Sequence, residues 1–107
     1  MLNIGIKDLL MENWGPKADS MEATAWVKFI DEHSKWACYV YALNPKDGDE
    51  VACIIESPND FEICDWSLAE IEKLFNEEGE VPEIDEEYRP MKAINIVNRL
   101  REFKEER

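Results

Sequence analysis

Residues 61–75 read FEICDWSLAEIEKLF, and this stretch holds the junction between a strand and a helix. Ser67 is followed three residues later by Glu70, which is the capping-box pattern that begins a helix. With Ser67 as the N-cap, Trp66 and Ile71 occupy the two positions of a hydrophobic staple. The helix is expected over about residues 67–77, and it buries one apolar face formed by Leu68, Ile71, Leu74 and Phe75.

Four apolar segments before this helix have the composition of strands, namely residues 24–30, 35–43, 50–56 and 60–66. The segments between them are DEHS, NPKDGD and SPN, which are rich in turn-forming residues. Connections this short join antiparallel neighbours. Neither face of residues 35–43 is strongly polar, so this strand is expected in the centre of the sheet.

Two further helices are expected near the ends of the chain. Apolar residues at helical spacing predict a short helix over about residues 4–13, which Gly15 and Pro16 end. Residues 17–23 show no period and are expected to form a connection, and the acidic tract 77–87 is expected to form a loop. After Pro90 a helix is expected to about residue 104, with an apolar stripe formed by Met91, Ile94, Val97, Leu100 and Phe103.

These elements predict an α+β fold: a four-stranded antiparallel meander sheet packed by two helices, with a short N-terminal helix. The two later helices are expected to cover the apolar face of the sheet. With 107 residues and 45% apolar residues the chain can bury one core, so a single domain over residues 1–107 is expected. Its tail, residues 104–107, is expected to fray.

The three cysteines indicate a reducing compartment. Cys38, Cys53 and Cys64 are odd in number, lack C-x-x-C spacing and lie in apolar stretches. Cys64 has acidic neighbours, which raise a thiol pKa, so a packed thiol is expected rather than a nucleophile.

The sequence also lacks the apolar run of a membrane helix and the features of a secretory signal. A cytoplasmic protein without a membrane partner is therefore expected.

The net charge of −13 is unevenly distributed along the chain. Residues 44–88 contain 16 of the 25 acidic residues, whereas their only basic residues are Lys46 and Lys73. A surface of this charge repels nucleic acid and anionic lipid and attracts basic partners. Direct binding to nucleic acid is therefore not expected.

The usual sequence patterns of catalytic and cofactor sites are missing. The single histidine, His33, lies in a polar turn, and the cysteines are too dispersed for a usual zinc spacing. The stretch NPKDGDE lacks the order of a calcium loop, and there is no glycine-rich phosphate loop. We therefore expect no catalytic residues, no metal and no cofactor, and a protein that is not an enzyme.

The acidic residues have two interpretations. In the first, they serve only solubility, and an apolar or aromatic patch makes the contacts of an interaction module or a homodimer. Alternatively, their carboxylates imitate nucleic-acid phosphates and block a basic partner such as a nuclease, with Trp14, Trp26 and Trp36 available as anchors. The residues predicted to contact that partner are Asp47, Asp49, Glu50, Glu77, Glu78, Glu80, Glu83, Asp85, Glu86 and Glu87.

Several of these segments resemble a family of small uncharacterised bacterial proteins carried by plasmids and phages. The similarity covers about residues 25–92, and the matched positions are Lys28-Phe29, Trp36, Tyr39, the junction at 67–72, Ile84 and Pro90. Cys38, Ala52-Cys53 and the stretch IDEEYRP depart from the family pattern. The resemblance implies a shared fold and a mobile-element context. That context suggests an anti-CRISPR or anti-restriction inhibitor, a small acidic protein that acts as a DNA mimic.

Overall fold

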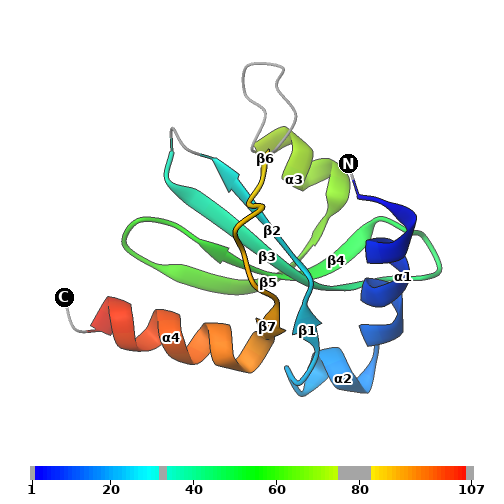
Figure 1. The fold of residues 1–107 in the computed structure, drawn as a ribbon, viewed down its shortest axis with the longest axis horizontal. Coiled ribbons are helices and arrows are strands. Elements are labelled where there is room, and N and C mark those ends of the chain that lie inside the picture. The colour runs from blue at the N-terminus through cyan, green and yellow to red at the C-terminus, as the bar shows by residue number, and fades with distance from the viewer. Residues whose placement is uncertain (1, 32–33, 75–82, 106–107) are drawn as a thin grey trace.

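The computed structural model describes residues 2–31, 34–74 and 83–105. It has an α+β fold around a five-stranded antiparallel sheet with strand order β5-β4-β3-β2-β6 (Figure 1). The strands are β2 (Val27–Asp31), β3 (Trp36–Leu43), β4 (Glu50–Glu56), β5 (Phe61–Ser67) and β6 (Glu83–Ile84). The predicted α+β class is confirmed, and β3 is the central strand as its two apolar faces indicated.

The predicted four-stranded sheet was wrong at its edge. β6 lies in the tract expected to be a loop, and it pairs with β2 through Phe29 opposite Ile84 and Ile30 opposite Glu83. A strand of two residues is too short to show the alternation by which a sequence predicts strands. The rest of that tract, residues 77–82, lies outside the described residues.

The predicted first strand is divided between two sheets. Residues of β1 (Thr24–Ala25) form a separate ribbon with β7 (Met91–Lys92), and the main sheet begins only at Val27. The chain changes partner at Trp26, which belongs to neither strand. Because β7 is far away in sequence, no local pattern could predict this division.

The N-terminal region contains two helices where one was predicted. The first, α1 (Ile4–Asn13), agrees with the prediction, and the Asn3 Oδ1 accepts a hydrogen bond from the Ile6 N–H at 2.8 Å. Gly15, with φ at 111°, follows α1, but Pro16 then begins α2 (Pro16–Asp19) within the expected connection. Proline is tolerated at a first helical position because the N–H there needs no intrahelical partner.

The C-terminal helix begins and ends slightly later than expected. It is α4 (Ala93–Glu105), because residues 91 and 92 form β7 instead of the first helical turn. The helix continues through Lys104, whereas residues 106 and 107 of the expected frayed tail lie outside the described residues.

Helices cover both faces of the sheet, so the prediction that the two later helices share one face was wrong (Figure 1). On one face α3 (Leu68–Leu74) and α1 pack over Phe29, Val40 and Val51. On the other face α4 and α2 pack over Tyr39, Tyr41 and Ile54. The cause is the alternation in β3, because its neighbouring side chains point to opposite faces and both sets are buried.

The predicted capping box is present at the start of α3. The Ser67 Oγ accepts a hydrogen bond from the Glu70 N–H at 2.9 Å, and the Glu70 Oε1 accepts one from the Ser67 N–H at 3.3 Å. Trp66 packs against the core that contains Leu68 and Ile71, as the staple predicted. The Leu74 side chain and Phe75, predicted for the same buried face, lie outside the description.

Replacing Ser67 with alanine is expected to lower the free energy of unfolding by ~1 kcal/mol, because the Glu70 N–H loses its acceptor. Urea denaturation measures the change. Ser20→Ala is the control, since that hydroxyl lies on the surface at the end of α2, and a change below ~0.5 kcal/mol is expected there. Equal losses in both variants would contradict a specific role of the capping box.

Candidate functional site

A hollow of about 430 Å³ lies between α2 and the sheet, and three carboxylates line it. Asp19 comes from the end of α2, Glu50 from the start of β4 and Asp65 from β5. Its other walls include two aromatic side chains and an exposed isoleucine. The term acidic hollow is used below for the site lined by Trp14, Asp19, Tyr41, Glu50, Ile63 and Asp65.

The register of the sheet explains why Glu50 and Asp65 lie together. Asp65 is opposite Ala52, and Glu50 is two residues before Ala52, so both side chains point to the face covered by α2. Asp19 and Asp65 are exposed, whereas Glu50 is half-buried and its Oε1 accepts a hydrogen bond from the Asn44 Nδ2 at 3.1 Å. Carboxylates therefore enter the hollow from two sides.

The electrostatics of the acidic hollow favour a cation. Among the described residues that line it, none is Lys or Arg. Burial, and to a smaller extent Cys53 and Asp65, raises the pKa of Tyr41 to about 12, so its phenol stays neutral at pH 7. The rings of Tyr41 and Trp14 add faces with which a cation can form cation–π interactions. Carboxylates and aromatic rings together suit the side chain of an arginine or a lysine.

Two of the predicted contact residues, Asp47 and Asp49, accept hydrogen bonds that stabilise the β3–β4 turn and its junction with α3. The Asp47 Oδ1 accepts hydrogen bonds from the N–H groups of Asp49 and Glu50 at 2.9 and 3.1 Å, which hold the Asp47 pKa below its usual value. The Asp49 Oδ1 accepts one from the Ala69 N–H at 3.3 Å, at the start of α3. Of the three predicted contact residues in this turn, only Glu50 lines the acidic hollow.

The predicted acids near β6 form a different group. Asp85 pairs with Lys28 at 3.5 Å, and its backbone N–H donates to the Lys28 carbonyl oxygen at 2.9 Å, so Asp85 ties this segment to β2. Glu83, Glu86 and Glu87 are exposed. The other predicted acids of this tract, Glu77, Glu78 and Glu80, lie outside the described residues.

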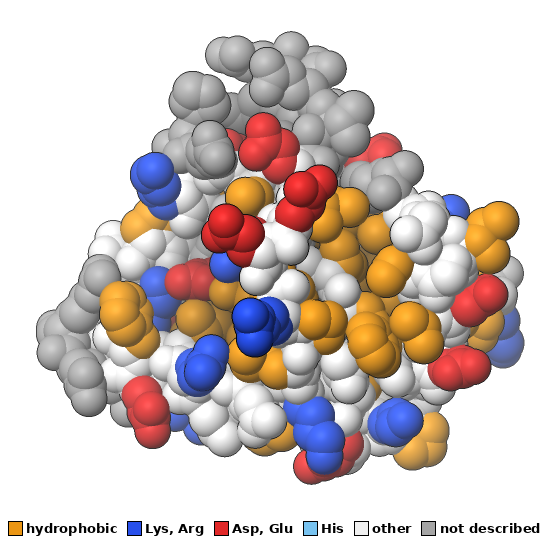
Figure 2. Space-filling view, in the orientation of Figure 1, with side chains coloured by type: hydrophobic (Ala, Val, Ile, Leu, Met, Phe, Trp, Pro, Cys, Tyr) orange, Lys and Arg blue, Asp and Glu red, His pale blue; other side chains and the backbone are white. Residues whose placement is uncertain are grey.

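The predicted contact residues thus do not form one surface in the part of the chain that the structure describes. β6 pairs with β2 at one edge of the sheet, whereas Glu50 is opposite Ser67 of β5 at the other edge. Figure 2 shows several acidic side chains near the top of one face and several basic side chains across its lower half. Asp19 and Asp65 were missed by the sequence interpretation. Asp19 lies outside the acidic region 44–88, and Asp65 lies inside it but outside the two short segments, 47–50 and 77–87, from which the contact residues were chosen.

The cysteines pack together on the other face of the sheet. Cys53 and Cys64 are opposite each other in the register of β4 and β5, with their Sγ atoms 3.9 Å apart, and both pack against the core on that face together with Cys38. Hydrogen bonding with Cys53, followed by burial, raises the Cys64 pKa, and hydrogen bonding with Cys38 raises that of Cys53. This arrangement agrees with the expected packed thiol at Cys64.

Cys64 is accordingly expected to react with iodoacetamide at pH 8 more than about tenfold more slowly in the folded protein than in urea, because the thiolate is the reactive form. Mass spectrometry of timed, quenched samples measures the rates at each cysteine. Free cysteine treated in both buffers corrects for the direct effect of urea. Equal rates in folded and unfolded protein would contradict the raised pKa.

The other predicted residues have less prominent positions. Trp14, Trp26 and Trp36 are each half-buried and packed against a core, and of these three Trp14 lines the acidic hollow. His33 lies outside the described residues.

Within the described ranges there is no cluster of three His, Cys, Asp or Glu side chains that could hold a metal. The same ranges contain no helix long and apolar enough to cross a membrane.

Comparison of the chain with known protein families, with curated proteins and with solved structures finds no match.

Proposed function

We propose that this protein is a non-catalytic binding protein that docks a basic partner through the acidic hollow and thereby blocks it. The observation that supports this function best is the convergence of Asp19, Glu50 and Asp65 beside Trp14 and Tyr41, with no basic residue among the described lining. An arginine or lysine of the partner would enter the hollow. The net charge of −13 would then steer the two proteins together.

Exposed acids beyond the hollow support the same proposal. Glu62 of β5 and Glu70 and Glu72 of α3 are exposed, and in the described part of the chain none of them lies within ion-pair distance of a base. A partner with an extended basic surface, such as the nucleic-acid channel of a host-defence nuclease, fits this distribution of charge. An anti-CRISPR or anti-restriction inhibitor is the specific form of the proposed function.

The alternative, an assembly module with an apolar patch, finds less support. The large apolar side chains that are exposed in the described residues are Ile4, Ile63, Ile84 and Phe103. They belong to α1, β5, β6 and α4, so four different elements carry them. Single exposed apolar residues are ordinary on protein surfaces and do not mark an interface.

A pull-down of the tagged protein from host lysate at about 0.05 M and about 0.3 M salt tests the proposal, because salt screens exposed charges. We expect a nucleic-acid enzyme to be retained at low salt and released by salt or by its own nucleic acid. The double variant D19N/D65N is expected to retain at least about tenfold less, since two charged contacts are lost.

The matched control is D8N/D60N, which removes the same charge from exposed positions that do not line the acidic hollow. It is expected to retain nearly as much partner as the unmodified protein. Equal losses in both double variants would indicate only nonspecific attraction. Recovery of the protein alone, or of a partner that resists salt, would contradict the proposal and favour the assembly module.

A further inference from the structure

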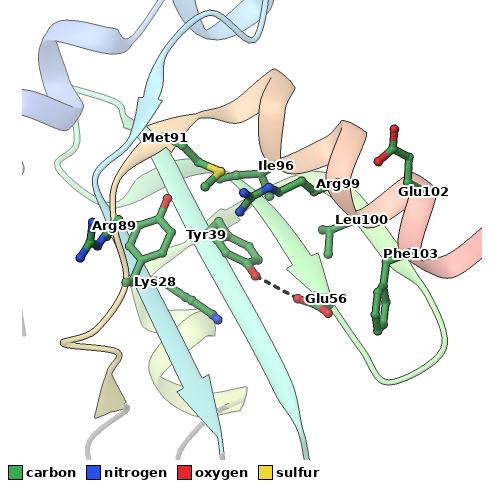
Figure 3. A pocket seen from close by; sticks show the side chains of 11 residues that line it. Lys28, Tyr39, Glu56, Arg89, Met91, Ile96, Arg99, Leu100, Glu102 and Phe103 are labelled. Atoms are coloured by element: carbon green, nitrogen blue, oxygen red, sulfur yellow. Dashed lines mark hydrogen bonds between the residues drawn. The ribbon is translucent and has the colours of Figure 1, made fainter.

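A second hollow, of about 740 Å³, lies between the sheet and α4, and it shares no lining residue with the acidic hollow. Figure 3 shows Tyr39 of β3 on one side, with Ile96 and Leu100 of α4 across from it. The volume is within the usual range for small-molecule sites, and apolar side chains form much of the wall. We call it the basic hollow, after the lining residues Lys28, Arg89 and Arg99.

The aromatic wall of the basic hollow is fixed by its own contacts. The Tyr39 hydroxyl donates a hydrogen bond to the Glu56 Oε1 at 3.0 Å, and the Tyr88 ring meets the Tyr39 ring edge to face, with centroids 5.8 Å apart. The Tyr88 hydroxyl donates to the Ala25 carbonyl oxygen at 2.8 Å. Both rings are therefore held in place before any ligand arrives, which lowers the entropy cost of binding.

Two arginines at this hollow have no acidic partner among the described residues. Arg89 and Arg99 are exposed, and within the described residues neither has a carboxylate at ion-pair distance. The ion pairs of the described residues involve only Lys28, Lys92 and Lys104, so the two arginines are distinguished by their place at the hollow and not by the missing carboxylate. Lys28 differs, because its Nζ pairs with Asp85 at 3.5 Å while lying 5.2 Å from the centre of the Tyr39 ring.

The two carboxylates of the basic hollow do not cancel this positive charge. Glu56 is already engaged, since Tyr39 donates to its Oε1 and the Lys104 Nζ lies 3.2 Å from its Oε2. Glu102 is exposed at the rim, and in Figure 3 its carboxylate points away from the hollow. Arg99 extends from α4 toward the strand that carries Tyr39 in the same view. The donors at the hollow that lack a carboxylate partner among the described residues are thus two guanidinium groups.

We infer that the basic hollow binds a small organic anion, in which a phosphate or a carboxylate is attached to a flat ring. The anionic group is held by Arg99, because guanidinium forms paired hydrogen bonds with either kind of oxyanion. Arg89, which Figure 3 shows well apart from Arg99, adds positive charge at the other end of the hollow. The ring packs against Tyr39 and Tyr88, and Phe103 at the end of the hollow adds a further aromatic surface. The basic hollow shares no lining residue with the acidic hollow, so it is a separate site.

The test uses ¹H–¹⁵N NMR titrations of the whole chain with four probes. Adenosine monophosphate and indole-3-acetate carry a ring with a phosphate or a carboxylate, adenosine carries the ring without charge, and inorganic phosphate carries the charge without a ring. We expect at least one ring anion to shift the amide signals of residues around Tyr39, Arg89 and Arg99. Adenosine and inorganic phosphate are expected to bind at least about tenfold more weakly.

Arginine variants identify the groups that bind. Arg99→Gln is expected to weaken binding of the ring anion about tenfold, and Arg89→Gln, at the other end of the hollow, is expected to weaken it less. Arg101→Gln is the matched control, because Arg101 is exposed on the same helix and does not line the hollow. The inference is overturned if neither ring anion shifts these signals, if adenosine binds equally well, or if Arg101→Gln weakens binding as much as Arg99→Gln.

Discussion

Replacing Asn13 with alanine is expected to lower the free energy of unfolding by about 3 kcal/mol, because one buried and one part-buried carbonyl group lose their donor. Asn13 is 5% exposed at the end of α1. Its Nδ2 donates to the Thr24 carbonyl oxygen at 3.0 Å and to the Tyr41 carbonyl oxygen at 2.9 Å. Both acceptors lie where the sheet is irregular. The ladder of β3 and β4 shifts register between Val40 and Ala42, and Thr24 lies in β1, from which the chain passes into the main sheet only at Val27.

Chemical denaturation of Asn13→Ala measures this effect, and Asn95→Ala is the matched control. Asn95 is exposed on α4, so its replacement is expected to change stability by less than ~0.5 kcal/mol. Asn13→Asp adds a further comparison, because a carboxylate keeps the size of the side chain but offers acceptors where donors are needed. If Asn13→Asp proved as stable as the unmodified protein, the two hydrogen bonds could not have the importance assigned to them.

The elements predicted correctly are those with local signals in the sequence. The capping box at Ser67 and Glu70, the short helix α1 and the central position of β3 each depend on residues close together in the chain. The role of Asn13 could not be predicted in this way. Its acceptors are 11 and 28 residues away, and asparagine at a helix end is also typical of an exposed cap.

The two hollows show the same limit for function. The acidic hollow combines residues 19, 50 and 65, of which the sequence interpretation singled out only Glu50. The basic hollow combines Lys28 with Arg89 and Arg99, although Arg89 directly follows the most acidic part of the chain. Net charge along the sequence predicts the average field of the protein. It does not predict where the fold leaves a cation unpaired, because that depends on which distant strands and helices meet.

Lys104 on α4 joins the C-terminal helix to the β4–β5 turn, and replacing it with methionine is expected to cost about 3 kcal/mol. Its Nζ donates to the Glu56 Oε2 at 3.2 Å and to the carbonyl oxygens of Ser57 and Pro58 at 2.9 and 3.3 Å. An ammonium group has three protons, so every donor is used. The Lys104 and Glu56 side chains are only 9% and 23% exposed, so solvent replaces the lost interaction poorly.

The control is Lys92→Met, since the pair of Lys92 with Glu22 has a similar N–O distance of 2.9 Å but is 54% and 55% exposed. A change below ~0.5 kcal/mol is expected there, because exposed ion pairs contribute little.

A double-mutant cycle of Lys104→Met with Glu56→Gln then separates the ion pair from the two carbonyl contacts. Since Ser57 and Pro58 still lose their donor when Glu56 is already neutral, Lys104→Met is expected to remain destabilising in the Glu56→Gln background. A negligible effect in that background would mean that the charge pair alone holds α4 to the turn.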